Sequence, residues 1–354
     1  MMHAVIPALR LRPANLKCAD ERARISAFIA EDMCTTPFHR LDWIDAIEAG
    51  TGHDAYVLVA ESGRALRGVL PLNAVHSPLF GRALVSTGFA VNGGILAHDE
   101  VAAVALARAA EALAHSLSCP TIELRGGPAP AGWHVDAQTY LGFVRDLARD
   151  DDAQLTAIPR KQRAEVRKSL DLGMTVTVEN GAAARAAHYA VYAESVRNLG
   201  TPVFPRSLFS ALMDAFGEDA DILTVHHEGQ PVASVLSLYH RGTVMPYWGG
   251  GTRTARHLRA NELMYFALMN HARARGCTRF DFGRSKAGTG AAAYKKNWGF
   301  EAVPLTYAKW SAKGQAPRNI NPLDPRYRLQ VQLWQKLPLW AANRIGPFIA
   351  RGLG

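Results

Sequence analysis

The chain has 354 residues, a formal net charge of +9 and 48% hydrophobic residues. At roughly 150 residues per domain this length suggests two domains with an appendage, and the composition is that of an ordinary globular protein. Residues 312–354 contain seven basic residues and one acid, so this tail carries +6 of the +9. A general DNA-binding protein is not expected, because its basic stripe would cover the folded body.

Several other classes of protein are also disfavoured. The four cysteines are scattered and form no CxxC, which argues against a disulfide scaffold and a zinc ribbon. The 13 histidines form no HxxxH or HExxH pattern, so no metal is expected. The N-terminus has no apolar stretch typical of a signal peptide, and no apolar run reaches the roughly 18 residues of a membrane span. We therefore expect a cytoplasmic protein.

The first half of the chain predicts a strand, a glycine-rich turn, a helix and a second strand. GVLPLNAVHS has the composition of a buried strand, and glycines follow at 93–94. An alanine-rich helix is expected from about residue 100 to about residue 117, followed by the strand TIELR.

The middle of the chain begins with a charged run at 146–152 that is typical of a linker between domains. Helices are then expected from just after Pro159 to about residue 172, at about 183–199 and over PRSLFSALMDAF. MTVTVEN alternates as a strand does, and ADILTVHHEGQPVASVLSLYH predicts a hairpin.

The first helix of this middle region carries a basic cluster. Arg160, Arg163 and Arg167 share one face, because residues three and four apart are neighbours on a helix, and Lys161 flanks them. Guanidinium groups bind phosphates through a planar, bidentate fork. The cluster is therefore either a phosphate-binding face or a solvated helix surface.

The second half repeats the order of the first. After the strand PVASVLSLYH come glycines at 249–251, a helix expected from about 260 to about 275, and the strand TRFDFGR. A last strand, VPLTYAKW, is expected after Glu301. Three pairs of residues keep one spacing of 158, namely Gly93 and Gly251, Cys119 and Cys277, and Glu123 and Asp281. The agreement favours an internal duplication over the chance recurrence of strand, turn, helix and strand.

The second repeat carries most of the side chains suited to chemistry. The start of its helix, where Asn261 lies, would present free backbone N–H groups and a positive dipole end to a phosphate. Asp281, Arg284 and Lys286 follow at the end of the next strand, where ligands bind in open α/β sheets. Asp281 is either a proton acceptor for an attacking amine or the structural partner of Arg284.

Three more residues complete the predicted site. Tyr294 is either a proton donor to a leaving group or a packing residue, and Lys295 or its neighbour Lys296 is a candidate phosphate contact. Trp248 stands beside three glycines and is either a ligand-facing aromatic ledge or part of the core.

The tail, LQVQLWQKLPLWAANRIGPFIARGLG, is apolar with basic residues between the apolar ones. Leu329, Leu333, Trp334, Leu337 and Trp340 can form one stripe. Tryptophan together with lysine and arginine is typical of a helix lying on anionic lipid. The tail therefore either packs across the domains or contacts the inner membrane peripherally.

AAAYKKNWGFEAV resembles the closing helix and strand of the GNAT acyltransferase fold, in which a tyrosine on the helix precedes a Gly-Phe turn. Two such halves resemble the FemAB group. The ordered segments IPRKQRAEVRKSL, YAESVRNLGTPVFPRSLF and FDFGRSKAGTGAAAYKKNWGF are similar to FemAB-type proteins of exosortase/PEP-CTERM loci. The likeness covers nearly the whole chain. RHLRANEL, however, lacks the spaced glycines with which GNAT proteins hold acyl-CoA.

This resemblance implies an α/β protein of two tandem GNAT-like domains with mixed sheets flanked by helices. The expected parts are a degenerate domain at 1–150, an active domain at 151–311 and the basic tail at 312–354. The implied reaction is acyl or aminoacyl transfer to an amine of a phosphate-bearing cell-envelope or exopolysaccharide precursor. No cofactor is expected to be bound, and the donor is either aminoacyl-tRNA or acyl-CoA. The alternatives are an acyl-CoA-dependent N-acyltransferase and a catalytically silent envelope-assembly protein.

Overall fold

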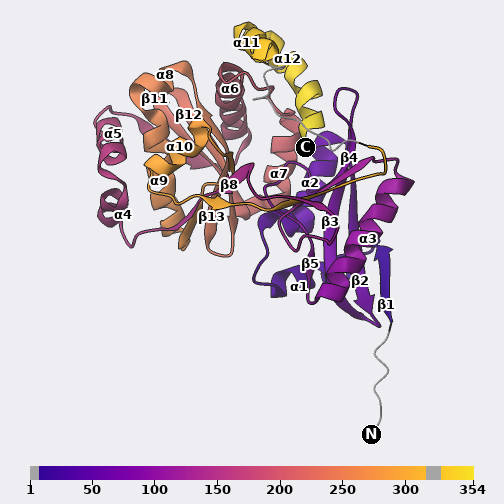
Figure 1. Cartoon of the computed structure of the whole chain (residues 1–354). Helices are drawn as coiled ribbons and strands as arrows, with labels where there is room; N and C mark the ends of the chain where they lie inside the picture. Colours follow the sequence, from indigo (N-terminus) through magenta and orange to yellow (C-terminus); the bar gives the residue numbers. More distant parts are fainter. Residues whose placement is uncertain (1–7, 316–327) are drawn as a thin grey trace. The chain divides into compact units, whose positions relative to one another are not determined.

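The computed structural model describes residues 8–315 and 328–354, which form two compact units. Of these residues, the first unit contains 8–137, 306–315 and 351–354, and the second contains 138–305 and 328–350. Figure 1 shows helices against sheets throughout the described chain, which confirms the expected mixed α/β architecture. Among the described residues, no helix combines the length and the apolar character needed to cross a membrane.

An eight-stranded sheet forms the first unit, in the order β1-β2-β3-β4-β6-β17-β7, with β5 paired to β3. Its only parallel neighbours in the described residues are β4 and β6. The strands are β1 (Leu9–Pro13), β2 (Asp54–Ser62), β3 (Ala65–Ser77), β4 (Gly81–Ser86), β5 (Leu96–Ala97), β6 (Thr121–Arg125), β7 (His134–Asp136) and β17 (Tyr307–Ser311).

The helices of the first unit are α1 (Ala19–Glu31), η1 (Pro37–His39), α2 (Leu41–Thr51), α3 (Glu100–Ser116) and η4 (Arg351–Leu353). Helix α3 begins where the Asp99 carboxylate accepts a hydrogen bond from the Ala102 amide at 2.8 Å. Its fully buried residues, among them Ala102, Leu106 and Ala110, recur every four positions. Alanine at these positions lets the helix lie close to the sheet.

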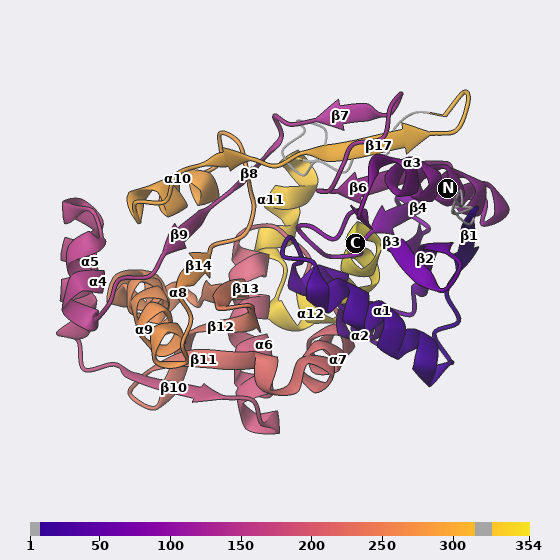
Figure 2. The same cartoon turned by 90° about the horizontal axis from the view of Figure 1, so that it is seen from below.

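The second unit contains a six-stranded sheet in the order β10-β11-β12-β13-β14-β9, which can be followed in Figure 2, and a three-stranded sheet β15-β8-β16. The strands are β8 (Tyr140–Gly142), β9 (Val144–Asp146), β10 (Thr175–Glu179), β11 (Ala220–His227), β12 (Gln230–His240), β13 (Thr243–Gly251), β14 (Arg279–Asp281), β15 (Ser285–Lys286) and β16 (Val303–Pro304).

The helices of the second unit are α4 (Asp151–Ala157), α5 (Arg160–Leu170), α6 (Ala182–Asn198), α7 (Arg206–Phe216), η2 (Gly217–Asp219), α8 (Arg253–Leu258), α9 (Ala260–Ala274), α10 (Gly290–Asn297), α11 (Arg328–Lys336) and α12 (Leu339–Ala350). Helix α9 contributes buried residues such as Met264 and Leu268 to the core of this unit. Phe280, Phe282 and Trp298 of the same core hold β14 and the end of α10 together.

Both repeated segments have the same structure. The predicted helices correspond to α3 and α9, and the strands that follow them are β6 and β14. Each of these strands pairs in parallel with an earlier strand, β4 in the first unit and β13 in the second. The connections to the helices differ, because the short β5 lies between β4 and α3 whereas a helix at 253–258 lies between β13 and α9. The expected helices of the middle region are also present as α5, α6 and α7.

Two expectations about the local structure are wrong. The charged run at 146–152 ends a strand and starts a helix, because the Asp150 carboxylate caps α4 by accepting from the Ala153 amide at 2.7 Å. The chain passes between the units earlier, at Ala137 and Gln138. VPLTYAKW, expected as one strand, is divided between β16 and β17, which belong to different sheets.

Candidate functional site

Strands β13 and β14 pair in parallel over a short stretch, and most of the predicted site residues lie just beyond the end of this pairing. Only Thr243 with Arg279 and Val244 with Phe280 are paired, although β13 continues to Gly251. On its other side β13 contains a bulge, since Leu236 is opposite Trp248 whereas Ser237 is opposite Pro246. Bulges of this kind re-aim side chains and are common next to active sites.

Three glycines at the end of β13 allow neighbouring helices to approach the strand closely. A Cβ at Gly250 would lie 2.2 Å from the Ser195 hydroxyl oxygen of α6. A Cβ at Gly251 would lie 2.6 Å from the Ala255 Cβ and 2.9 Å from Asn261 Oδ1. The Asn261 Oδ1 atom is buried and has no hydrogen-bond partner among the described residues. Asn261 therefore presents an unused acceptor beside the end of β13.

Asp281 and Lys295 form the charged centre of the site. Asp281 is the last residue of β14, and its Oδ1 accepts a hydrogen bond from the Gly283 amide at 2.8 Å. Lys295 Nζ donates to the carbonyl oxygens of Gly283 at 3.1 Å and Arg284 at 2.9 Å. The same turn therefore receives a hydrogen bond from the lysine and donates one to the aspartate.

Burial shifts the pKa values of both Asp281 and Lys295 toward neutral pH. Burial raises the pKa of Asp281, although the Gly283 amide and the charge of Lys295 oppose this effect. Burial lowers the pKa of Lys295 to about 8, although the charge of Asp281 opposes that change. The Lys295 ammonium lies 5.3 Å and 5.7 Å from the ring centroids of Phe143 and Phe282, which explains its poor solvation. Perturbed acids and bases of this kind are typical of functional sites.

Arg284 and Lys286 share the ring of Tyr140. The Arg284 guanidinium carbon lies 4.8 Å from the ring centroid, and the Lys286 ammonium lies 5.8 Å from it. The ring is held there because Tyr140 pairs with Lys286 across β8 and β15. Both cations therefore have an aromatic platform that holds them beside the end of β14. Tyr140 was not among the residues predicted from the sequence.

Tyr294 reaches a carboxylate that the sequence analysis missed. Its hydroxyl donates to Glu262 Oε1 at 3.4 Å, a long hydrogen bond. Burial raises the pKa of Glu262 and raises that of Tyr294 well above its ordinary value. Glu262 lies in the first turn of α9, where an acid is normally explained by the helix dipole, so the sequence pattern alone does not single it out.

The basic cluster on α5 is mostly exposed. Arg160, Lys161 and Arg167 face solvent, whereas half-buried Arg163 donates to the Thr156 carbonyl oxygen at 2.9 Å. The opposite face of α5 packs against α9, and Glu165 forms an ion pair with Arg259 at the start of α9. Three of the four predicted phosphate contacts on this helix therefore stay accessible.

Trp248 occupies a core position. Its side chain is 7% exposed. The ring packs against Phe209, 4.8 Å away between centroids, and Phe204, 5.7 Å away. This position fits core packing, the second of the two interpretations that the sequence allowed.

The corresponding strand pair of the first unit is closed. β4 and β6 pair at three positions up to Ser86 and Leu124. The buried Arg125 guanidinium then donates to the carbonyl oxygens of Thr87 at 3.1 Å and Ala90 at 2.9 Å. A charged side chain of the protein itself thus occupies the end of this strand pair.

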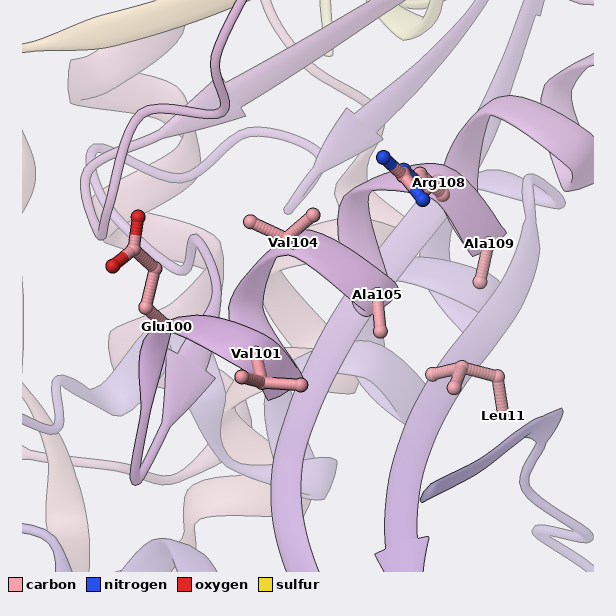
Figure 3. A pocket seen from close by; sticks show the side chains of 7 residues that line it. All are labelled: Leu11, Glu100, Val101, Val104, Ala105, Arg108 and Ala109. Atoms are coloured by element: carbon pink, nitrogen blue, oxygen red, sulfur yellow. The ribbon is translucent and has the colours of Figure 1, made fainter. Parts of the chain in front are cut away.

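A hollow of about 650 Å³ on the first unit offers less chemistry. Figure 3 shows that small and aliphatic side chains of α3 form most of its wall. It is lined by Leu11, Glu100, Val101, Val104, Ala105, Arg108 and Ala109, none of them a predicted site residue. In residues 8–315 and 328–354, no group of three or more His, Cys, Asp and Glu side chains could hold a metal ion.

Comparison with known proteins identifies a similar domain and similar folds. Residues 159–296 match the family model described as an acetyltransferase (GNAT) domain. A crystal structure of FemX superposes with a TM-score of 0.65 at 16% identity, covering 81% of this chain and 95% of that one. A tandem GNAT protein from the clavulanic acid biosynthesis pathway superposes with a TM-score of 0.58 at 14% identity, covering 87% and 100%.

A third similar structure is that of L-PGS from Bacillus licheniformis, with a TM-score of 0.53 at 14% identity, covering 89% of this chain and 97% of that one. A search of curated protein sequences finds no match. The chain thus has a mixed α/β fold similar to that of GNAT proteins, among them a tandem GNAT protein, and the match to a GNAT acetyltransferase domain supports an acyltransferase.

Proposed function

We propose that the second unit transfers an acyl or aminoacyl group to an amine of a phosphate-bearing cell-envelope or exopolysaccharide precursor. The observation that carries this proposal is the contrast between the two strand pairs. The β13–β14 pair stops after two residue pairs with Asp281 and Lys295 beyond it, whereas the β4–β6 pair is closed by Arg125. The first unit is then the degenerate half, which supports the second without carrying out chemistry.

The reaction requires a neutral amine to attack the donor carbonyl. A C–N bond forms, the carbonyl oxygen becomes an oxyanion, and the attacking nitrogen must lose a proton. Asp281 accepts that proton, since burial raises the pKa of its carboxyl group. The Lys295 ammonium donates a hydrogen bond to the oxyanion or to a donor phosphate. When the carbonyl re-forms, the leaving oxygen or sulfur departs and takes a proton from Tyr294, which Glu262 holds by a hydrogen bond.

The basic residues have a different role, which is to bind phosphate. Arg284 and Lys286 are supported by Tyr140 near the end of β14. The α5 cluster of Arg160, Lys161, Arg163 and Arg167 provides further donors for the phosphates of either substrate. The unused Oδ1 acceptor of Asn261 is available to an N–H or O–H group of a substrate. The fold that this chain shares with FemX and L-PGS is compatible with this class of reaction.

Two donors are compatible with this site, and one feature favours aminoacyl-tRNA. Helix α8, rather than a glycine-rich loop, connects β13 to α9. Fewer free backbone N–H groups are therefore available there for the pyrophosphate of acyl-CoA. Purified protein incubated with labelled aminoacyl-tRNA or labelled acetyl-CoA and an amine-bearing nucleotide sugar should label the acceptor from the tRNA. Labelling from acetyl-CoA alone would establish the acyl-CoA-dependent alternative.

The decisive experiment is mass spectrometry of envelope precursors and exopolysaccharide from the host with and without the gene. We expect one acyl or aminoacyl mass increment to disappear on deletion. Wild-type protein and Lys313→Gln, which changes an exposed lysine of the first unit, should restore it. Asp281→Asn and the double variant Arg284→Ala/Lys286→Ala should not. Restoration by all variants would leave the silent assembly protein as the better explanation.

Since such precursors are assembled at the membrane, we propose that the protein acts at the cytoplasmic face of the inner membrane and contacts the membrane peripherally.

A further inference from the structure

Helix α12 has two opposite faces of different character. Ala342, Gly346 and Ala350 are buried and recur every four residues. A Cβ at Gly346 would lie 3.0 Å from the Val203 backbone nitrogen, so this small-residue face is pressed against the second unit. Trp340, Arg344 and Phe348 are offset from that face by two residues, or about 200° around the helix. They therefore point away from the protein.

The outward residues of α12 are apolar and largely unshielded. Trp340 and Phe348 are each 73% exposed, and Arg344 between them is also exposed. Large apolar side chains so accessible to water are costly unless something covers them in use.

Helix α11 continues this arrangement. Its Val331 and Gln335 pack over Gly200, and the Gln335 carbonyl oxygen accepts a hydrogen bond from Arg197 at 3.3 Å. Leu329 and Leu333, offset by two residues from that contact, are 65% and 57% exposed. Figure 1 shows α11 and α12 next to each other beside α6. We call Leu329, Leu333, Lys336, Trp340, Arg344 and Phe348 the outer face.

The charged residues of the segment that contains α11 and α12 are all basic. Residues 328–354 contain Arg328, Lys336, Arg344 and Arg351 and no acidic residue. Lys336 and Arg344 lie on the outer face itself, among its apolar side chains. A protein partner that buried these cations would have to supply matching acids, whereas an anionic lipid surface leaves them at the level of its phosphates while the apolar rings enter the acyl region.

We propose that the outer face is a docking surface for an anionic lipid bilayer, on which α11 and α12 lie parallel to the membrane. Tryptophan and phenylalanine insert at the boundary between headgroups and acyl chains, where aromatic side chains are most stable. The two cations contribute about fivefold each to partitioning by attraction to the negative surface. This inference does not depend on the transfer reaction, because it concerns residues outside the proposed active site.

The test is cosedimentation of the full chain with vesicles of phosphatidylcholine alone or with phosphatidylglycerol added. We expect binding that requires phosphatidylglycerol and weakens with salt. Trp340→Ser/Phe348→Ser should reduce partitioning on the order of tenfold or more, because two large apolar side chains are lost. Lys336→Gln/Arg344→Gln should reduce it by about 25-fold.

Matched controls come from other exposed positions. Leu79→Ser/Val101→Ser removes apolar side chains that are 66% and 70% exposed on the first unit, and Arg149→Gln/Lys313→Gln removes two exposed cations. Both controls should bind as the wild type does, and far-UV circular dichroism should show every variant folded.

Three results would overturn the proposal. These are absence of binding to phosphatidylglycerol vesicles, equal losses in the controls and the outer-face variants, and a self-associated form that Trp340→Ser/Phe348→Ser dissociates without any vesicle binding by the wild type. Transfer activity measured on a soluble acceptor should be unchanged in the outer-face variants, so failure of the docking proposal and failure of the proposed function can be told apart.

Discussion

The poorly solvated ammonium of Lys295 should make the stability of the protein depend on pH in a particular direction. Its pKa is about 8 in the folded protein against an ordinary value of 10.5. The folded state therefore holds this proton less tightly than the unfolded state. The resulting loss of folding stability is present in full below about pH 8, and it disappears as the pH rises toward the pKa of the lysine in the unfolded chain.

The size of the effect follows from the two pKa values. A difference of this size corresponds to about 3 kcal/mol of unfolding free energy at low pH, of which about 2.5 kcal/mol should be recovered between pH 7 and pH 10. Lys295→Met keeps an unbranched apolar stem of similar length and removes the titrating ammonium. It also removes hydrogen bonds to two carbonyl oxygens, but that loss is nearly independent of pH. The stability of the wild type minus that of the variant should thus rise by about 2.5 kcal/mol across this range.

The assay is urea denaturation from pH 7 to pH 10, followed by fluorescence of the tryptophans, of which Trp298 is buried in the same core as the lysine stem. Other lysines and tyrosines titrate in this range too, and taking the difference between wild type and variant cancels them. Lys296→Met, which removes an exposed lysine from the same helix, serves as the control variant. A flat difference for Lys295→Met would refute the reasoning, because it would mean that the ammonium is solvated in the folded state.

Three other predictions concern stability. The Glu262→Gln variant should become progressively more stable than the wild type as the pH rises above about 4.5, because burial raises the pKa of this carboxyl group and its ionisation then costs folding free energy. Urea denaturation at pH 4, 6 and 8 measures the difference in stability, and a difference that does not change with pH would contradict the prediction. Arg125→Met should cost about 2–4 kcal/mol, because two buried carbonyl oxygens lose their donor and a carboxylate loses its partner; an unchanged urea midpoint would disprove that role. Gly250→Ala should cost about 1–3 kcal/mol from the clash with Ser195, and Ser195→Gly should recover part of it in the double variant.

The elements that could be predicted from the sequence are those whose signal is local. Helices α3 and α9, with the strands after them, were expected at nearly their observed bounds, because apolar spacing and the flanking turns are written in consecutive residues. VPLTYAKW has a uniform strand pattern, yet it is divided between two sheets. Nothing in its composition records which partner each half will meet.

The residues of the candidate site also divide into those that the sequence indicates and those that only the folded structure shows. Asp281, Arg284 and Lys286 can be predicted because they lie at the end of a strand, where ligands bind in open α/β sheets. Lys295 can be predicted as a candidate phosphate contact on the helix that follows. Glu262 was missed, since an acid in the first turn of a helix looks ordinary until a distant tyrosine is found beside it.

By itself, the sequence determined helices α3 and α9 with the strands after them, the repeat of 158 residues and the concentration of positive charge in the tail, because these can be read from the order of residues alone. Only the tertiary structure decided that one strand pair is closed by Arg125 while the other stops short. Only the tertiary structure placed Lys295 between two phenylalanine rings, where burial lowers its pKa, and turned Trp340 and Phe348 away from the protein. Solvation, pairing and exposure depend on residues far apart in the chain, so they exist only once the chain has folded.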